Sequence, residues 1–451
     1  MRARLIVIGL AAIAFLAFVQ LAVKAAPGEG SAPLLYTATQ HYEPLAWMHG
    51  ADRFTGATVV VLDSKGKHAL VPDFAASADA AVSFDGQRVL FAGKKQAADR
   101  WQVWEIALAG GEPRRVSSGS EDCVRPFYLA EDRVVYARKV AGRFAIEVTG
   151  LEGGKTLGLT YGPASYFPTG ILRDGRILFE AGYPLGGEDS PEIYTVYADG
   201  SGVESYRCDH GTARYEGREV SSGEIVFAAR SGLSRFTSAR AQAEHVSAPP
   251  GEYAGGPEET ASGDWILPWR RSSGAEFQLM RWKPGAATMR DVSGEHGLDA
   301  VQPVLLAEHA VAKRHPSGLH DWPNANLLCL SAYTSKFQFQ AGSVHAVRLY
   351  TRDGAGKPQL LGGASVERDG SFFVQVPTER PIQVELVDGA GKILQREAGF
   401  FWMRRGEQRV CVGCHAGPET APENAVPMIL LKSTTPADLT GAAARGAPGG
   451  N

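Results

Sequence analysis

A unit of 40 to 48 residues recurs through the first two thirds of the sequence. Each copy has a polar or glycine-containing turn followed by three apolar or aromatic residues, as in Asp85–Phe91 and Asp174–Phe179. The first apolar residues of six copies are residues 89, 134, 177, 225, 265 and 310, and the last copy, Ala307–Ala312, is degenerate. A period in the forties with turn and strand signals in every unit is typical of a β-propeller.

Companion strands support this interpretation. Trp101–Leu108, Ile193–Tyr197 and Phe277–Trp282 alternate between apolar and polar residues, and a turn follows each of them. This order of strand and turn motifs resembles that of TolB-type propellers. A further unit around Val59–Asp63 brings the expected number of blades to six or seven, and the propeller is expected to span residues 31–320.

Composition restricts the possible function. Lys and Arg total 46, Asp and Glu total 49, and the net charge is −3. The chain therefore lacks the excess of positive charge that drives general nucleic-acid binding. Five cysteines in 451 residues do not form a disulfide scaffold. Arg2 and Arg4, an apolar run over Leu5–Val19 and the small pair Ala25–Ala26 predict a signal peptide, or an uncleaved anchor, over residues 1–30. The mature chain is therefore expected to be periplasmic or otherwise exported in a bacterium.

A second β domain is expected at residues 321–400. Short strands are predicted at residues 327–330, 344–350, 371–376 and 382–387, separated by Asp-Gly turns. This pattern predicts an antiparallel, sandwich-like domain, and no helix of convincing length follows residue 30. The expected fold class is therefore all-β. Residues 435–451 are rich in Ala, Gly and Pro and are expected to form a disordered tail.

One motif carries specific chemistry. Cys411-Val412-Gly413-Cys414-His415 is the attachment sequence of c-type haem. Cys411 and Cys414 would form thioethers with the two vinyl groups, and His415 would be the proximal iron ligand. One haem is therefore expected in a segment covering residues 401–434.

Alternatives to haem remain open. A structural zinc site would use the same three residues with Cys329 as a fourth ligand, and a redox disulfide between Cys411 and Cys414 is a further possibility. For the sixth position of a haem iron, Met428 is the leading candidate. Weaker candidates for that position are Met403, His210, His315 and His320.

The chain resembles a known family over roughly residues 35–432, weakly in the propeller and strongly from about residue 365. Asn326–Leu330, Asp369–Pro377, Trp402–His415 and Thr420–Asn424 are similar to the middle domain of the hydrazine synthase alpha subunit and its relatives. The resemblance implies a haem module carried on a propeller. It also implies that the motif histidine can serve a nearby metal, which keeps a zinc site with Cys329 open.

The sequence departs from that family in two ways. It has no counterpart of the C-terminal multi-haem part, and no tyrosine follows Tyr350, although the family's iron ligand is a tyrosine shortly after the motif. Hydrazine synthesis is therefore not expected.

Three functions remain open. The first is an exported monohaem cytochrome on a propeller, serving electron transfer or a larger complex. The second is a haem oxidoreductase acting on a small nitrogen or oxygen compound, with unknown catalytic residues. The third is a non-redox binding propeller with structural haem or zinc. The expected partner is a redox protein or another subunit, with membrane contact only through an uncleaved anchor.

Overall fold

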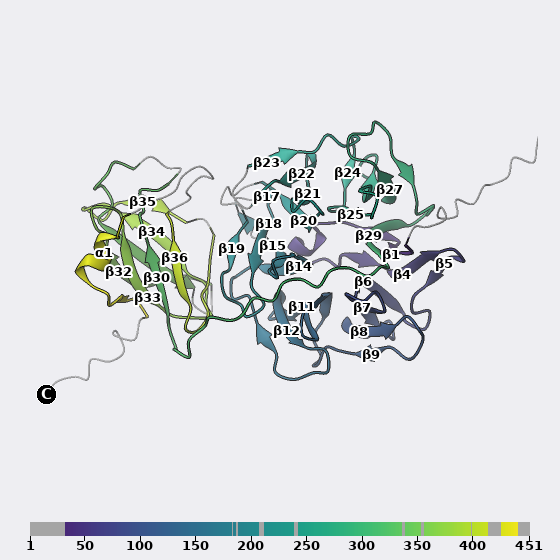
Figure 1. Cartoon of the computed structure of the whole chain (residues 1–451), viewed down its shortest axis with the longest axis horizontal. Coiled ribbons are helices and arrows are strands. Elements are labelled where there is room, and N and C mark those ends of the chain that lie inside the picture. The colour runs from purple at the N-terminus through teal and green to yellow at the C-terminus, as the bar shows by residue number, and fades with distance from the viewer. Residues whose placement is uncertain are drawn as a thin grey trace, which may run out of the picture.

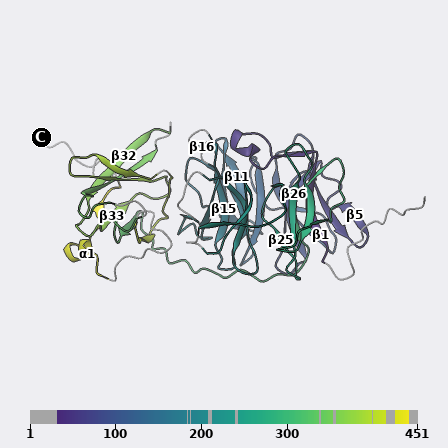
Figure 2. The same ribbon diagram turned by 90° about the horizontal axis from the view of Figure 1, so that it is seen from above.

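The computed structural model describes residues 32–182, 184–185, 188–206, 212–238, 242–335, 339–352, 356–397, 399–413 and 425–440. The predicted signal segment lies outside these residues, as do Cys414, His415 and His210. Two bodies lie side by side along the long axis of the molecule, a larger one formed by the first three quarters of the chain and a smaller C-terminal one (Figures 1 and 2). None of the described helices has the length and apolar character needed to cross a membrane.

The larger body is a propeller, with six blades in the described part of the chain. Each blade is an antiparallel sheet, ordered from the axis outward. Blade 1 contains β6 (Ala76–Val82), β7 (Arg88–Lys94), β8 (Gln102–Ala107) and β9 (Arg114–Arg115). Blade 2 contains β10 (Cys123–Leu129), β11 (Arg133–Val140), β12 (Arg143–Gly150) and β13 (Leu157–Gly158). Blade 3 contains β14 (Ser165–Ile171), β15 (Ile177–Gly182), β18 (Glu192–Val196) and β19 (Glu204–Ser205).

The other three blades follow the same order. Blade 4 contains β20 (Arg214–Glu219), β21 (Ile225–Ala229), β22 (Gly232–Phe236) and β23 (Ala243–His245). In blade 5 the inner strand is divided into β24 (Glu252–Tyr253) and β25 (Glu258–Glu259), followed by β26 (Trp265–Arg270), β27 (Gln278–Trp282) and β28 (Arg290–Asp291). Blade 6 contains β29 (Asp299–Leu305), β1 (Leu34–Thr39), β4 (Thr58–Asp63) and β5 (Gly66–Ala69). Two small hairpins, β2 (His41–Tyr42) with β3 (Phe54–Thr55) and β16 (Pro184–Leu185) with β17 (Glu188–Asp189), and the 3-10 helix η1 (Ala46–His49) extend from these sheets.

Blade 6 closes the ring and resolves the number of blades. Its inner strand β29 comes from the end of the propeller, whereas its other three strands come from the beginning of the chain. Val59–Asp63 therefore belongs to the same blade as β29 and does not form a seventh. The expectation of a sixth repeat copy at Ala307–Ala312 is wrong, because this segment contains no strand and belongs to a linker, residues 306–324, that leads to the smaller body.

Apolar contacts between neighbouring blades form the propeller's core. The five other predicted copies coincide with the second strands of blades 1 to 5, and these strands are buried on both faces. In β7, for example, Val89, Leu90, Phe91 and Ala92 are all fully buried. Val89 and Phe91 contact the core shared with blade 6, whereas Leu90 contacts the core shared with blade 2. A three-residue apolar run therefore connects two interblade cores, which explains why it recurs in each unit.

The smaller body is a sandwich of two four-stranded sheets. The first sheet has the order β36 (Gln408–Cys411), β30 (Ala325–Cys329), β33 (Phe372–Val376) and β37 (Ala437–Asp438). The second has the order β32 (Pro358–Ser365), β31 (Ala346–Arg352), β34 (Gln383–Val387) and β35 (Ile393–Arg396). Alternate residues of both sheets form one shared apolar core.

Two features of this sandwich differ from the antiparallel domain that the sequence predicts. The β36–β30 and β33–β37 pairs are parallel. In addition, Ala437–Asp438 forms a strand within the stretch expected to be a tail, and helix α1 (Met428–Lys432) precedes it. Residues 425–440 are therefore part of the domain.

Trp402 joins the two bodies. Its side chain is fully buried and packs in the core of blades 2 and 3, with its ring edge-on to Tyr166 at a centroid distance of 5.4 Å. Its indole Nε1–H donates a hydrogen bond to the carbonyl oxygen of Leu159 at 2.8 Å. Burying an aromatic side chain of this size across an interface fixes the smaller body against the outer side of the propeller.

Candidate haem-attachment site

Cys411 is the last residue of β36, which lies at the edge of its sheet. Across the sheet, the register places Cys411, Cys329 and Phe372 in one row. Register partners on neighbouring strands point to the same face, so both cysteines face the sandwich core. Cys329 is buried, Cys411 is half-buried against the same core, and no disulfide joins them.

The backbone is closely packed where the motif begins. The N–H of Leu330 donates to the carbonyl oxygen of Cys411 at 2.9 Å. A β-carbon at Gly413 would lie 2.1 Å from the carbonyl oxygen of Thr334, so only glycine fits at this position. The glycine inside the motif therefore lets the chain pass close to the loop after β30.

Met428 lies at the same end of this sheet. Its backbone N–H donates to Asp369 Oδ2 at 2.7 Å, and Ser371 Oγ accepts the next N–H, from Ile429, at 3.0 Å. Asp369 and Ser371 immediately precede β33, which is two strands from β36. At about 5 Å per strand, this separation is about 10 Å across the sheet. The structure thus brings the predicted ligand Met428 to the same sheet end as Cys411.

The other candidate axial ligands lie elsewhere. Met403 is fully buried in the sandwich core. His315 is on the linker, stacked on Tyr197 of the propeller at 3.6 Å between centroids. His320 is stacked on Trp322, and its backbone contacts Gly406, five residues before Cys411. None of the three is placed at the Cys411 end of β36.

Glu407 connects the propeller to the strand that carries the motif. Its carboxylate accepts the backbone N–H of Gly202 at 3.2 Å and that of Arg404 at 2.8 Å. It also accepts two hydrogen bonds from the guanidinium of Arg409, at 3.0 and 2.7 Å. Glu407 is only 6% exposed, so these charge-assisted bonds form away from solvent.

Two further residues complete this contact. Arg404 donates to Glu379 at 2.7 Å and also bonds the hydroxyl of Tyr161 on the propeller. Gly406 has φ of +70°, and a β-carbon there would lie 1.8 Å from the carbonyl oxygen of His320. The Gly406-Glu407-x-Arg409 run, which carries much of the sequence resemblance, therefore fixes β36 relative to the propeller.

A second polar cluster, which sequence reasoning missed, lies where the inner strands approach the propeller axis. The inner pairs of blades 1, 2, 4 and 6 each contain a β-bulge with a non-glycine residue of positive φ, and these residues are Asp79, Arg125, Glu216 and Gln302. Gln302 Nε2 donates to Asp79 Oδ1 at 2.6 Å, Arg125 N donates to Asp79 Oδ2 at 3.1 Å, and the Arg125 guanidinium pairs with Glu216. Residues far apart in sequence thus join four blades in one network.

Burial and the charges of this network shift the pKa values of two carboxyl groups, those of Asp79 and Glu180. Burial tends to raise the pKa of Asp79, but the guanidinium groups of Arg53 and Arg125 outweigh burial and lower it. Burial raises the pKa of Glu180 to about 7, with repulsion by Glu216 adding to the effect and Arg125 opposing it. Glu180 is fully buried; among the described residues its Oε1 forms no hydrogen bond, and the Arg125 guanidinium lies 3.7 Å from it. The network therefore holds one carboxyl that titrates near neutral pH.

Comparison with known proteins supports the resemblance in the C-terminal half. Residues 334–416 match the family model of the hydrazine synthase alpha subunit middle domain. The matched segment contains the whole Cys411–His415 motif. No curated protein matches the chain.

Solved structures extend the likeness of fold to the propeller. Hydrazine synthase from Kuenenia stuttgartiensis superposes with a TM-score of 0.76 at 16% identity, covering 89% of this chain and 72% of that chain. TolB from Acinetobacter baumannii has a TM-score of 0.46 at 14% identity, covering 63% of this chain and 69% of that chain. The propeller domain of the trilobed protease from Pyrococcus furiosus has a TM-score of 0.34 at 9% identity, covering 52% of this chain and 86% of that chain. The hydrazine synthase match covers most of this chain and shows that its overall fold is similar to that structure.

Proposed function

We propose that this protein is an exported monohaem c-type redox protein, in which the propeller holds the haem-bearing domain and presents it to a partner. The observation that carries the proposal is the Cys411-Val412-Gly413-Cys414-His415 motif at the end of an edge strand, within the segment that matches the hydrazine synthase family model. Haem is attached to such motifs outside the cytoplasm, which agrees with the predicted signal segment.

The described part of the site is compatible with covalent haem. Cys411 is half-buried and ends a strand that pairs only with β30 among the described strands, so the space beyond the sheet edge is not taken by another described strand. Cys411 and Cys414 would carry the thioethers, His415 would be one axial ligand, and Met428 is the proposed second. Haem supplies a one-electron iron couple. The role of the chain is to attach the group and fix it relative to the propeller.

The proposed partner is a redox protein or another subunit of a complex. The matched structure is that of hydrazine synthase, and the family model describes an alpha subunit, so a role within an assembly is a reasonable extension to this chain. Electron transfer is proposed over hydrazine synthesis, because the sequence has no tyrosine after Tyr350. An open iron would instead favour the alternative of an oxidoreductase for a small nitrogen or oxygen compound.

One structural observation favours a second candidate, a zinc site. Cys329 and Cys411 lie opposite each other on neighbouring strands, which is suitable for two thiolate ligands of one ion. With Cys414 or His415 they would provide the sulfur and nitrogen donors that structural zinc takes. A haem that uses Cys411, Cys414 and His415 leaves only Cys329 of this set for zinc, so the two proposals predict different metal contents.

Absorption spectroscopy tests the proposal. The full chain is exported in a host competent for c-type haem maturation, and spectra are recorded oxidised, reduced, and reduced with CO. We expect covalent haem in the wild type and in the control variant Cys123→Ser. We expect none when Cys411→Ser and Cys414→Ser are combined. A low-spin reduced spectrum that CO does not change in the wild type, but does change in Met428→Ala, supports the electron carrier. Colourless protein containing zinc contradicts it.

A further inference from the structure

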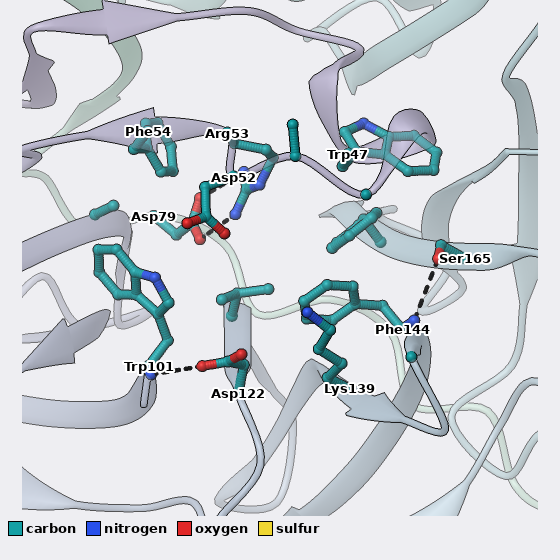
Figure 3. Close-up of a pocket in the computed structure, with 16 residues that line it drawn as sticks. Trp47, Asp52, Arg53, Phe54, Asp79, Trp101, Asp122, Lys139, Phe144 and Ser165 are labelled. Atoms are coloured by element: carbon teal, nitrogen blue, oxygen red, sulfur yellow. Dashed lines mark hydrogen bonds and ion pairs between the residues drawn. The ribbon is translucent and has the colours of Figure 1, made fainter. Parts of the chain in front are cut away.

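A cleft opens at the propeller face where the inner strands of blades 1, 2 and 3 begin (Figure 3). Aromatic side chains line much of it, and these are Trp47, Phe54, Trp101, Phe144 and Phe167. The cavity volume is about 70 Å³. A cavity needs roughly 10–15 Å³ of such volume to hold one water, so this cleft exceeds the requirement for a single water-sized group. A porphyrin does not fit, whereas a small organic molecule does.

One ion pair at this cleft is already satisfied. Arg53 donates to both carboxylate oxygens of Asp79, at 3.1 and 2.7 Å, and both side chains are buried. Asp79 also accepts hydrogen bonds from Arg125 and Gln302. Since these groups neutralise one another, the pair provides a fixed polar wall and does not attract a further charge.

Two oppositely charged side chains at the same cleft have no ion-pair partner among the described residues. Asp52 is exposed and Lys139 is half-buried, so water solvates both until a ligand replaces it. Asp52 lies in the loop before β3, and Lys139 lies near the end of β11. Neither side chain forms a hydrogen bond or an ion pair within the described chain, and Figure 3 draws no bond between them. The ammonium of Lys139 lies 5.7 Å from the centroid of the Phe144 ring, which orients it along the aromatic wall.

A third carboxylate belongs to the wall. Asp122 is buried and accepts the backbone N–H of Trp101 at 3.0 Å, with the exposed guanidinium of Arg100 at 3.6 Å. These contacts hold its carboxylate in place. Its charge is only partly compensated, because Arg100 is 69% exposed and its attraction is weakened by solvent. The negative side of the cleft therefore includes Asp52 and, to a smaller extent, Asp122.

We propose that this cleft binds a small zwitterion, a molecule such as an amino acid or a betaine. The ligand's ammonium would be held by Asp52 and the aromatic rings, and its carboxylate by Lys139. A simple amine would leave Lys139 uncompensated and would be repelled by it, and a simple carboxylate would be repelled by Asp52. A ligand with both charges satisfies both residues, while the aromatic rings cover its methylene or methyl groups.

Isothermal titration calorimetry of the full exported chain tests the charge requirement. The probes are 4-aminobutyrate and glycine betaine as zwitterions, with n-butylamine and butyrate as analogues that carry one charge. We expect at least one zwitterion to bind at least tenfold more tightly than both single-charge analogues. Absence of zwitterion binding, or equally tight binding of n-butylamine, overturns the proposal.

Variants locate the binding. Asp52→Asn and Lys139→Met each remove one free charge, and each is expected to weaken zwitterion binding at least tenfold. The matched controls Asp73→Asn and Lys155→Met change exposed residues outside the cleft, and the dissociation constant is expected to stay within twofold of the wild-type value. Thermal unfolding checks that all four variants are folded. Zwitterion binding that survives both cleft substitutions places the ligand elsewhere and overturns the proposal.

Discussion

Glu180 offers a quantitative test of the polar network near the propeller axis, which contains Asp79, Arg125, Glu216 and Gln302. In the folded protein burial and Glu216 raise its pKa to about 7, from an ordinary value of 4.5. The folded state therefore holds this proton more tightly than the unfolded state, and stability falls as the pH rises from about 4.5 to 7. A shift of this size corresponds to about 3 kcal/mol in full, at about 1.4 kcal/mol per pH unit, and to about 2–3 kcal/mol between pH 5 and pH 8.

Glu180→Gln removes this titration with little change in shape. Its amide oxygen can still accept the hydrogen bond that the Glu216 N–H now donates to Glu180 Oε2 at 3.1 Å. The free energy of unfolding in urea, followed by tryptophan fluorescence, is measured near pH 5 and near pH 8. When the pH is raised from 5 to 8, the free energy of unfolding of the variant should increase by about 2–3 kcal/mol relative to that of the wild type. Glu112→Gln, at an exposed glutamate, is the control for removal of a charge. A difference between variant and wild type that does not change with pH refutes the reasoning.

Three substitutions test the contact between the two bodies. Glu407→Gln removes the carboxylate that pairs with the half-buried Arg409 and should cost about 2–3 kcal/mol in urea unfolding, against less than about 1 kcal/mol for the exposed control Glu244→Gln. Equal costs would contradict the assigned role. Trp402→Ala should cost about 3–5 kcal/mol and speed proteolysis between the bodies, and an unchanged cleavage rate would argue against the interface. Gly406→Ala places a β-carbon against backbone at positive φ, so a melting temperature equal to that of the wild type would contradict the geometry.

The propeller could largely be predicted from sequence because one local pattern repeats in it. The three-residue apolar runs predicted the second strands of five blades, since those residues are buried on both faces wherever they occur. The same rule failed at Ala307–Ala312, where an apolar run follows the closing strand without joining a sheet. Closure depends on β29 pairing with β1, more than 250 residues away, and local patterns do not report such pairings.

The candidate site could be predicted only in part. The spacing of Cys411, Cys414 and His415 predicts their chemistry, but it does not predict that Cys329 is the register partner of Cys411. The polar network near the propeller axis was missed because its members come from β-bulges in different blades. A β-bulge depends on how two strands pair, which a local sequence pattern does not show. A weak signal was available, because Pro126 and Pro303 directly follow Arg125 and Gln302. A proline at the same position of two repeats indicates a break in strand pairing there.

The covalent attachment of one haem is the central claim, and the intact mass of the purified chain tests it most directly. The protein is exported with the haem maturation system, denatured, and measured by mass spectrometry beside a double variant that carries both Cys411→Ser and Cys414→Ser. The account predicts a mass increase of one haem per chain that survives denaturation, and no comparable addition in a variant lacking both cysteines. A wild-type mass equal to that of the polypeptide alone, with zinc in the native protein, would contradict it.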